Sequence, residues 1–161
     1  MRKSINKKTK LYVAYGSNLH TGQMSHRCPD AVIIGSGIIE NYELFFAGWP
    51  GHGVATILES EGHNVPVGVW VISERDEKSL DIYEGWPALY RKEEIEVAME
   101  DGSKIIGMVY IMNYEYRGQK MLEAAPTPGY YNTIATGYKT FGLDKKILEA
   151  ARKRTENLKE V

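Results

Sequence analysis

The first two thirds of the chain consist of short apolar segments separated by glycine, asparagine and aspartate. Valine, isoleucine and aromatic residues dominate these segments, which favours β-strands. Gly35 and Gly37 indicate a bulge or sharp bend. Asp101-Gly102 predicts a hairpin. Short strands with glycine kinks are typical of a small closed or partly closed barrel. The predicted strands are Leu11–Tyr15, Ala31–Ile34, Ile38–Glu40, Tyr42–Ala47, Val54–Leu58, Val65–Ile72, Ile95–Met99 and Lys104–Met112.

Helical patterns occur once between the strands and again at the end of the chain. Ser73-Glu74-Arg75-Asp76 has the form of a capping box, so a short helix is expected to follow and to end before Gly85 and Pro87. Apolar residues recur with helical spacing from Tyr130 to Phe141. Asp144 is expected to cap a last helix. Strands first and helices last predict an α+β fold.

Composition fits one domain, which we expect to span residues 11–161. The chain has 161 residues, of which 43% are hydrophobic and 25% charged, with a net charge of −1. This balance indicates no preference for nucleic acid or membranes, and no segment is long and apolar enough to span a bilayer. Cys28 has no second cysteine to pair with, which favours a reducing cytoplasm.

Residues 1–10 are basic and contain no acidic side chain. The apolar run that follows is too short for a signal peptide, because it stops at Gly16-Ser17-Asn18. A nucleic-acid-binding arm is one alternative. We expect a flexible, solvated tail, since chain termini are usually poorly ordered.

The segment Tyr15-Gly16-Ser17-Asn18-Leu19 is the first candidate site. It follows an apolar strand and forms a turn. Gly16 lets another molecule approach the backbone, and Ser17 and Asn18 offer hydroxyl and amide groups. A turn of this kind can present several backbone N–H groups to an anion or oxyanion. The alternative is an ordinary tight turn.

Glu84 is the second candidate. At a helix C-terminus the dipole disfavours an ionised carboxylate, and burial beside Tyr83 and Trp86 would further raise the pKa of Glu84. A carboxyl group with a raised pKa suits proton transfer near neutral pH. The alternative is a solvated glutamate at the end of a helix.

Other patterns are weaker. Gly35-Ser36-Gly37 lacks the third glycine of a dinucleotide fingerprint, and the spacing of His20, His26 and Cys28 fits no standard zinc site. We therefore expect no bound metal. Cys28 is expected to be a buried, inert thiol.

The two candidate sites together resemble segments of the γ-glutamylcyclotransferase family. The resemblance extends from about Leu11 to Leu143, and the turn is closer to the general γ-glutamyl branch than to the glutathione-specific or γ-glutamylamine branches. The similar segments are Tyr15–Leu19, Arg27-Cys28-Pro29, Gly68-Val69-Trp70, Leu80–Gly85, and the spacing of Tyr130, Ile134, Gly137 and Gly142-Leu143.

This resemblance implies a small mixed β-barrel with peripheral helices. It implies an enzyme that cyclises a γ-glutamyl compound to 5-oxoproline and releases the amine, without metal or cofactor. Glu84 would be the general base and acid, while the turn Tyr15, Gly16, Ser17, Asn18 and Leu19, together with Tyr130, would bind substrate. For Tyr130, a packing role at a helix start is the alternative.

The implied partner is a small γ-glutamyl molecule, and the enzyme could form a homodimer. Two alternatives remain open from the residues themselves. One is a barrel that binds a small ligand without reacting it. The other is an enzyme that hydrolyses or transfers the γ-glutamyl group. Release of 5-oxoproline distinguishes cyclisation from both.

Overall fold

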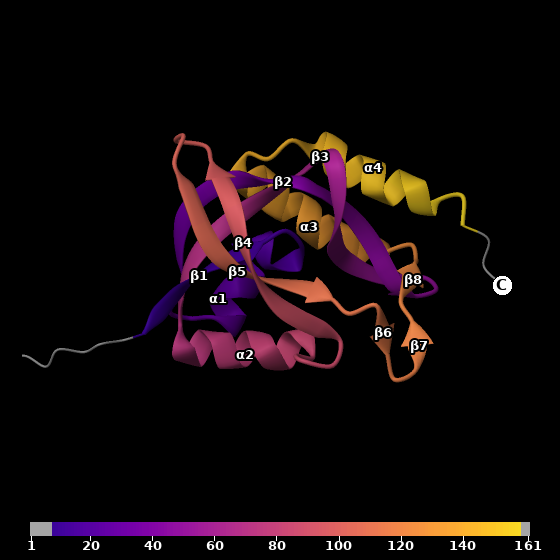
Figure 1. Cartoon of the computed structure of the whole chain (residues 1–161), viewed down its shortest axis with the longest axis horizontal. Helices are drawn as coiled ribbons and strands as arrows, with labels where there is room; N and C mark the ends of the chain where they lie inside the picture. Colours follow the sequence, from indigo (N-terminus) through magenta and orange to yellow (C-terminus); the bar gives the residue numbers. More distant parts are fainter. Residues whose placement is uncertain (1–7, 159–161) are drawn as a thin grey trace, which may run out of the picture.

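Five strands close into a mixed barrel in the computed structural model, which describes residues 8–158 (Figure 1). The strand order is β3-β1-β5-β4-β2, and pairing of β2 with β3 completes the circle. β1 runs antiparallel to β3 and parallel to β5, which makes the barrel mixed, as predicted. The barrel strands are β1 (Thr9–Ala14), β2 (Val32–Trp49), β3 (His52–Ser73), β4 (Tyr90–Met99) and β5 (Lys104–Met112).

β2 and β3 are much longer than the sequence analysis predicted. Three predicted strands merge into β2 and two merge into β3, and the two strands pair from Val32↔Val71 to Trp49↔His52. The expected breaks are irregularities within continuous strands, with register shifts between Ile33 and Gly35 and between Glu40 and Tyr42. Glycine and asparagine therefore bend these strands and do not end them.

The hairpin predicted at Asp101-Gly102 is confirmed, since β4 and β5 pair antiparallel on either side of it. β4 starts at Tyr90, five residues before the predicted Ile95. Of the predicted tail 1–10, residues 1–7 lie outside the described residues, whereas Thr9 and Lys10 pair with Ser73 and Ile72 in the barrel.

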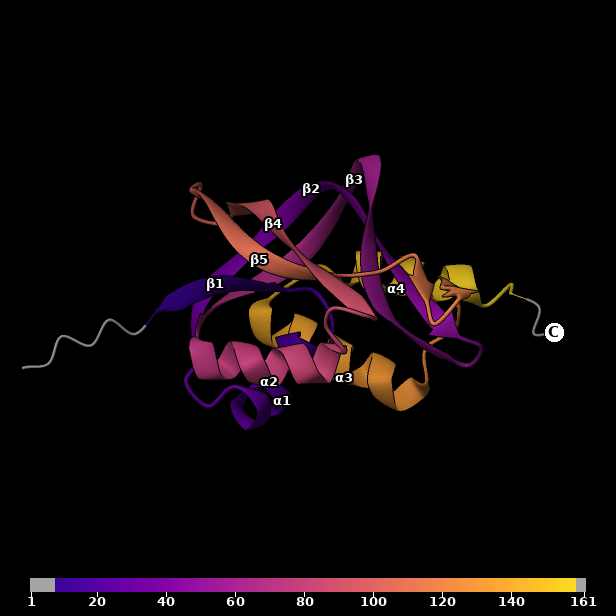
Figure 2. The ribbon, with the colours of Figure 1, turned by 60° about the horizontal axis from the view of Figure 1, so that its bottom comes forward.

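Helices surround the barrel, with α1, α2 and α3 on one side of it (Figure 2). The predicted capping box is present: the Ser73 hydroxyl accepts from the Asp76 N–H, and the Asp76 carboxylate accepts from the Ser73 N–H. Asp144 caps α4 through the Lys146 N–H, also as predicted. The helices are α1 (Thr21–Arg27), α2 (Glu74–Glu84), α3 (Pro128–Phe141) and α4 (Lys145–Thr155), with a 3₁₀ turn η1 at Ser17–Leu19 and short strands β6 (Glu115–Tyr116), β7 (Gln119–Lys120) and β8 (Leu122–Glu123).

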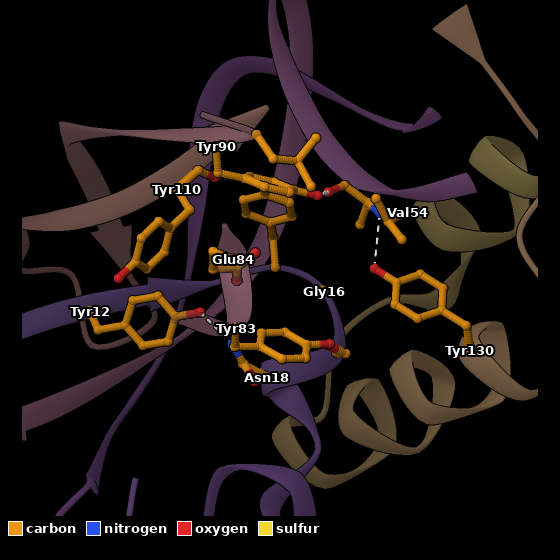
Figure 3. A pocket seen from close by; sticks show the side chains of 13 residues that line it. Tyr12, Gly16, Asn18, Val54, Tyr83, Glu84, Tyr90, Tyr110 and Tyr130 are labelled. Carbon is orange, nitrogen blue, oxygen red and sulfur yellow. Dashed lines mark hydrogen bonds between the residues drawn. The ribbon is translucent and has the colours of Figure 1, made fainter. Parts of the chain in front are cut away.

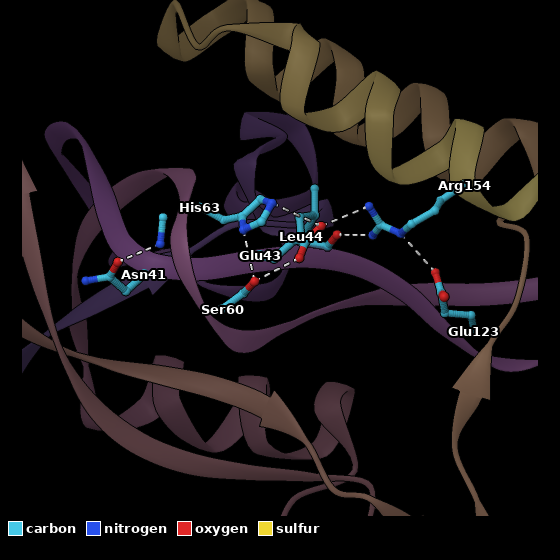
Figure 4. A network of polar contacts seen from close by, with 8 residues as sticks. Asn41, Glu43, Leu44, Ser60, His63, Glu123 and Arg154 are labelled. Carbon is cyan, nitrogen blue, oxygen red and sulfur yellow. Dashed lines mark hydrogen bonds and ion pairs between the residues drawn. The ribbon is translucent and has the colours of Figure 1, made fainter.

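Arg154 fastens α4 to the barrel (Figure 4). Its guanidinium donates to the Leu44 carbonyl at 2.7 Å and forms ion pairs with Glu43 and Glu123, each at 3.2 Å. Glu43 lies on β2 and Glu123 on β8, so one side chain joins three elements.

Candidate functional site

A cavity of about 190 Å³ lies where the end of β1, the end of α2 and the start of α3 meet the barrel (Figure 3). It brings together most of the residues singled out in the sequence, although Gly16 and Glu84 are far apart along the chain. Its lining residues are Tyr12, Tyr15, Gly16, Ser17, Asn18, Val54, Ala55, Tyr83, Glu84, Leu89, Tyr90, Tyr110 and Tyr130.

The turn after β1 forms one wall of the cavity. The N–H groups of Leu19 and His20 donate to the carbonyls of Gly16 and Ser17, both at 3.0 Å, which makes η1. First-turn N–H groups have no partner within their own helix, so those of Ser17 and Asn18 remain for another acceptor. A Cβ at position 16 would lie 3.2 Å from the Ala55 Cβ, so the space beside the turn is tight for any residue larger than glycine.

The prediction that the Leu19 side chain helps to line the substrate site requires a correction. Leu19 is not among the lining residues, and its side chain is fully buried. Positions 68 and 137 carry glycine at the places where Leu19 packs, because a Cβ there would lie 2.9 Å and 2.5 Å from Leu19 side-chain atoms. Leu19 therefore anchors the turn in the core; its N–H is also used within η1.

Glu84 ends α2 and lies at the base of the cavity. The helix stops there because Gly85 adopts a left-handed conformation with φ of 65°. Figure 3 shows the Glu84 side chain between Tyr12 and Tyr110 on one side and Gly16 on the other. Burial raises the pKa of Glu84 from 4.5 to about 7, although the Arg27 charge partly opposes this.

The Glu84 carboxylate forms no hydrogen bond or ion pair with any other residue in the range 8–158. Tyr83 lines the cavity and contributes to this enclosure. Trp86 does not: it is 43% exposed and stacks with the Lys92 ammonium, 4.1 Å from the ring centre. Glu84 is thus an enclosed carboxyl group, ready to exchange a proton with a bound molecule.

Tyrosine hydroxyls form most of the polar part of the wall. Burial, with the nearby Glu84 charge as a second cause, raises the pKa of Tyr12 and Tyr15, so these phenols stay neutral. Tyr15 donates to the Tyr110 carbonyl at 2.6 Å. Tyr12 accepts from the Asn18 amide at 2.9 Å, which leaves its own proton free to donate.

Tyr130 lies on the opposite wall. Its hydroxyl accepts from the Ala55 N–H at 2.9 Å, so its proton is also available to a ligand. Burial raises the pKa of Tyr130 well above its usual range. Tyr130 thus packs at the start of α3 and also lines the cavity, while its contact with substrate stays a prediction.

Several lining residues gave no signal in the sequence. Tyr12, Tyr90 and Tyr110 are strand residues, and in a chain with eleven tyrosines nothing marks these three. Ala55 contributes backbone groups, since its carbonyl accepts from Tyr90 and its N–H donates to Tyr130. Only the closed barrel brings these positions to one place.

Within residues 8–158, no cluster of three or more His, Cys, Asp or Glu side chains could hold a metal ion. Cys28 is buried, and burial raises its pKa to about 12. None of the described helices combines the length and apolar character needed to cross a membrane.

Comparison with known proteins identifies the family. The sequence model of the protein family described as "Gamma-glutamyl cyclotransferase, AIG2-like" matches residues 12–132. This chain belongs to the γ-glutamyl cyclotransferase family. It is 35% identical to mouse gamma-glutamylcyclotransferase over 150 residues, covering 88% of this chain and 76% of the mouse protein. The human protein of the same name is 34% identical over 149 residues, covering 86% of this chain and 75% of its own length.

The fold agrees with this family assignment. A solved structure titled "Gamma-glutamyl cyclotransferase" superposes with a TM-score of 0.78 at 28% identity, covering 96% of this chain and 90% of that one. The γ-glutamyl cyclotransferases are enzymes, and the resemblance noted in the sequence is confirmed. The matched region contains every predicted site residue, from Tyr15 to Tyr130.

Proposed function

We propose that this protein cyclises a γ-glutamyl amino acid or amine to 5-oxoproline and releases the free amine. The observation that carries the proposal is the unpaired Glu84 carboxyl group, whose pKa is raised to about 7 inside the cavity. Family membership supports the same reaction class. The substrate is a small molecule, and the reaction is expected to take place in the cytoplasm.

Glu84 first accepts a proton from the substrate's α-ammonium group. The free amine then attacks the γ-carbonyl carbon, a C–N bond forms, and a five-membered ring closes. Because nucleophile and electrophile belong to one molecule, holding them in contact supplies much of the acceleration. Glu84 returns its proton to the leaving nitrogen, and the bond between that nitrogen and the γ-carbon breaks. The ring nitrogen gives its second proton to the Glu84 carboxylate, and 5-oxoproline and the amine separate.

The oxyanion formed during attack needs hydrogen-bond donors. Ser17, Asn18, Tyr12 and Tyr130 line the cavity, and the backbone N–H groups of the first two and the hydroxyl groups of the last two are suited to this role. A low-dielectric cavity strengthens such donors relative to water.

A panel of γ-glutamyl amino acids and γ-glutamyl amines, incubated with the purified protein and followed by mass spectrometry, tests the proposal. We expect 5-oxoproline and free amine in equal amounts. Free glutamate would identify a hydrolase, and a new γ-glutamyl compound would identify a transferase. Tight binding without any product would identify a ligand-binding barrel. Each of these three results would replace the proposal.

A further inference from the structure

Arg27, the last residue of α1, contacts both sides of the cavity without lining it. One guanidinium nitrogen donates to the Asn18 side-chain oxygen at 2.6 Å. The guanidinium carbon lies 3.5 Å from the centre of the Tyr83 ring. Asn18 belongs to the turn and Tyr83 to the end of α2, so Arg27 spans the two segments between which substrate would bind.

The contact with Asn18 fixes the direction of a hydrogen-bond chain. Because Arg27 can only donate, the Asn18 oxygen must face it, and the Asn18 NH₂ group must face the Tyr12 hydroxyl. Tyr12 thus accepts from Asn18, and its own proton points elsewhere. Arg27 in this way determines that Tyr12 is a donor in the cavity.

The contact with Tyr83 fixes the other segment. The Tyr83 hydroxyl lies 3.0 Å from the Ser17 hydroxyl, which joins the end of α2 to the turn directly. The Arg27 guanidinium over the ring face adds a second contact that holds this tyrosine. Glu84 is the next residue, so holding Tyr83 also holds the backbone that carries the Glu84 carboxyl group.

Arg27 is also the charged side chain that acts on Glu84. The other titratable groups facing Glu84 are tyrosines whose pKa values burial raises, so they are neutral: Tyr12 of β1, Tyr15 beside it, Tyr90 of β4, Tyr110 of β5 and Tyr130 of α3. Asp81, one turn earlier on α2, is engaged by Lys92 and by the Tyr110 hydroxyl.

We propose that Arg27 is a positioning residue that holds the Ser17–Asn18 turn and the Tyr83–Glu84 end of α2 in one relative geometry. This inference rests on the proposed function for its effect on turnover. Its structural part does not depend on that function, because the two contacts and the charge exist without substrate.

Arg27→Met is the direct test, because methionine keeps much of the bulk and removes both the donors and the charge. We expect kcat to fall about tenfold to a hundredfold, since small misplacements of reacting groups have costs of this size. KM should stay within about threefold of the wild-type value, because ground-state binding contacts are kept. The acid limb of the pH–rate profile should move to higher pH, because the cation that opposes the raised pKa of Glu84 is gone.

Arg27→Lys separates charge from geometry. Lysine restores a positive charge, so the acid limb should return toward the wild-type position. The kcat value should remain low, since an ammonium cannot both bond Asn18 and stack flat on Tyr83. Arg75→Met is the matched control: Arg75 is an exposed arginine near the start of α2, paired with Asp30 and not among the residues that line the cavity, so its loss should change neither kcat nor the profile.

Two Tyr83 variants test the stacking contact. Tyr83→Phe keeps the ring under Arg27 and removes only the bond to Ser17, whereas Tyr83→Leu removes both. We expect Tyr83→Leu to lower kcat further than Tyr83→Phe does. Equal losses in the two variants would overturn the stacking part of the proposal.

A readout without substrate keeps this inference separate from the proposed function. Titration of ¹³C-labelled glutamate side chains by NMR should show the pKa of Glu84 rising from about 7 to a higher value in Arg27→Met. An unchanged Glu84 titration would overturn the electrostatic part of the inference, and an unchanged kcat in Arg27→Met would overturn the positioning part. A large rise in KM with kcat unchanged would also overturn it, by showing that Arg27 binds substrate directly. A wild-type protein that forms no 5-oxoproline would refute the proposed function, while the titration would still decide whether Arg27 acts on Glu84.

Discussion

Replacing Glu84 by glutamine should make the protein more stable above neutral pH. The folded structure encloses the Glu84 carboxyl group and raises its pKa from 4.5 to about 7. The folded state therefore keeps a proton between these two values that the unfolded chain releases. Wild-type stability should fall as the pH rises through this window, and the whole cost should be present above pH 7.

The size of the effect follows from the two pKa values. At about 1.4 kcal/mol per pH unit, the interval from 4.5 to about 7 corresponds to about 3 kcal/mol. Glutamine has nearly the same shape and carries no charge, so it avoids this cost at every pH. Glu84→Gln and wild type should have similar unfolding free energies near pH 4, and the variant should be more stable by about 3 kcal/mol near pH 8.

Urea unfolding across this pH range measures the difference directly, because other titrating groups contribute equally to both proteins. Glu61→Gln, an exposed position on β3, is the control and should follow wild type at every pH. A difference between Glu84→Gln and wild type that does not depend on pH would refute the reasoning, as would a variant less stable than wild type at pH 8.

Three further predictions concern other parts of the structure. The value of kcat/KM should rise with pH along an acid limb centred near 7, because only ionised Glu84 accepts a proton; a flat profile from pH 5 to 8 would exclude Glu84 as the base. Gly137→Ala should lower both stability, by about 2 kcal/mol, and activity, because its Cβ would lie 2.5 Å from Leu19 and displace the turn. Gly129→Ala on the same helix meets nothing within 4 Å, so it should leave turnover unchanged and should not lower the thermal unfolding temperature. Arg154→Met should reduce the urea-unfolding free energy by about 1–2 kcal/mol with kcat/KM unchanged, whereas the neighbouring Lys153→Met should change neither.

The local pattern of residues predicted the helix ends well. Ser73 and Asp76 form their capping box, Gly85 ends α2, and Asp144 caps α4. Each of these signals depends on a few adjacent residues, so sequence alone contains the needed information. The position of Glu84 at the end of α2 followed from the same signals.

Strand ends and the full cavity depend on contacts that local patterns do not contain. Asn41 has a positive φ of 64° within β2. Asparagine often indicates a turn, but here it forms only a bend, because β3 pairs with β2 on both sides of it. Leu19 is the last residue of the turn in sequence, yet its side chain packs in the core, where the glycines at positions 68 and 137 leave room for it. Helix α1 buries only Met24, which leaves too little apolar periodicity to predict it.

The sequence predicted correctly that the pKa of Glu84 is raised, but the cause in the structure is partly different. Burial in the cavity raises the pKa of Glu84, and Arg27 partly opposes it. Trp86 lies outside this environment, beside Lys92. The closure of the barrel encloses the carboxyl group, and closure is a property of the whole chain.

The rate of 5-oxoproline formation by Glu84→Gln tests the central claim most directly. Glutamine keeps the size and hydrogen-bonding groups of the side chain but cannot take up and return a proton. With a γ-glutamyl substrate that the wild type turns over, the variant should be slower by about 10²–10⁴ while folding normally. Turnover at the wild-type rate would contradict the account, because Glu84 would then have no part in moving the proton.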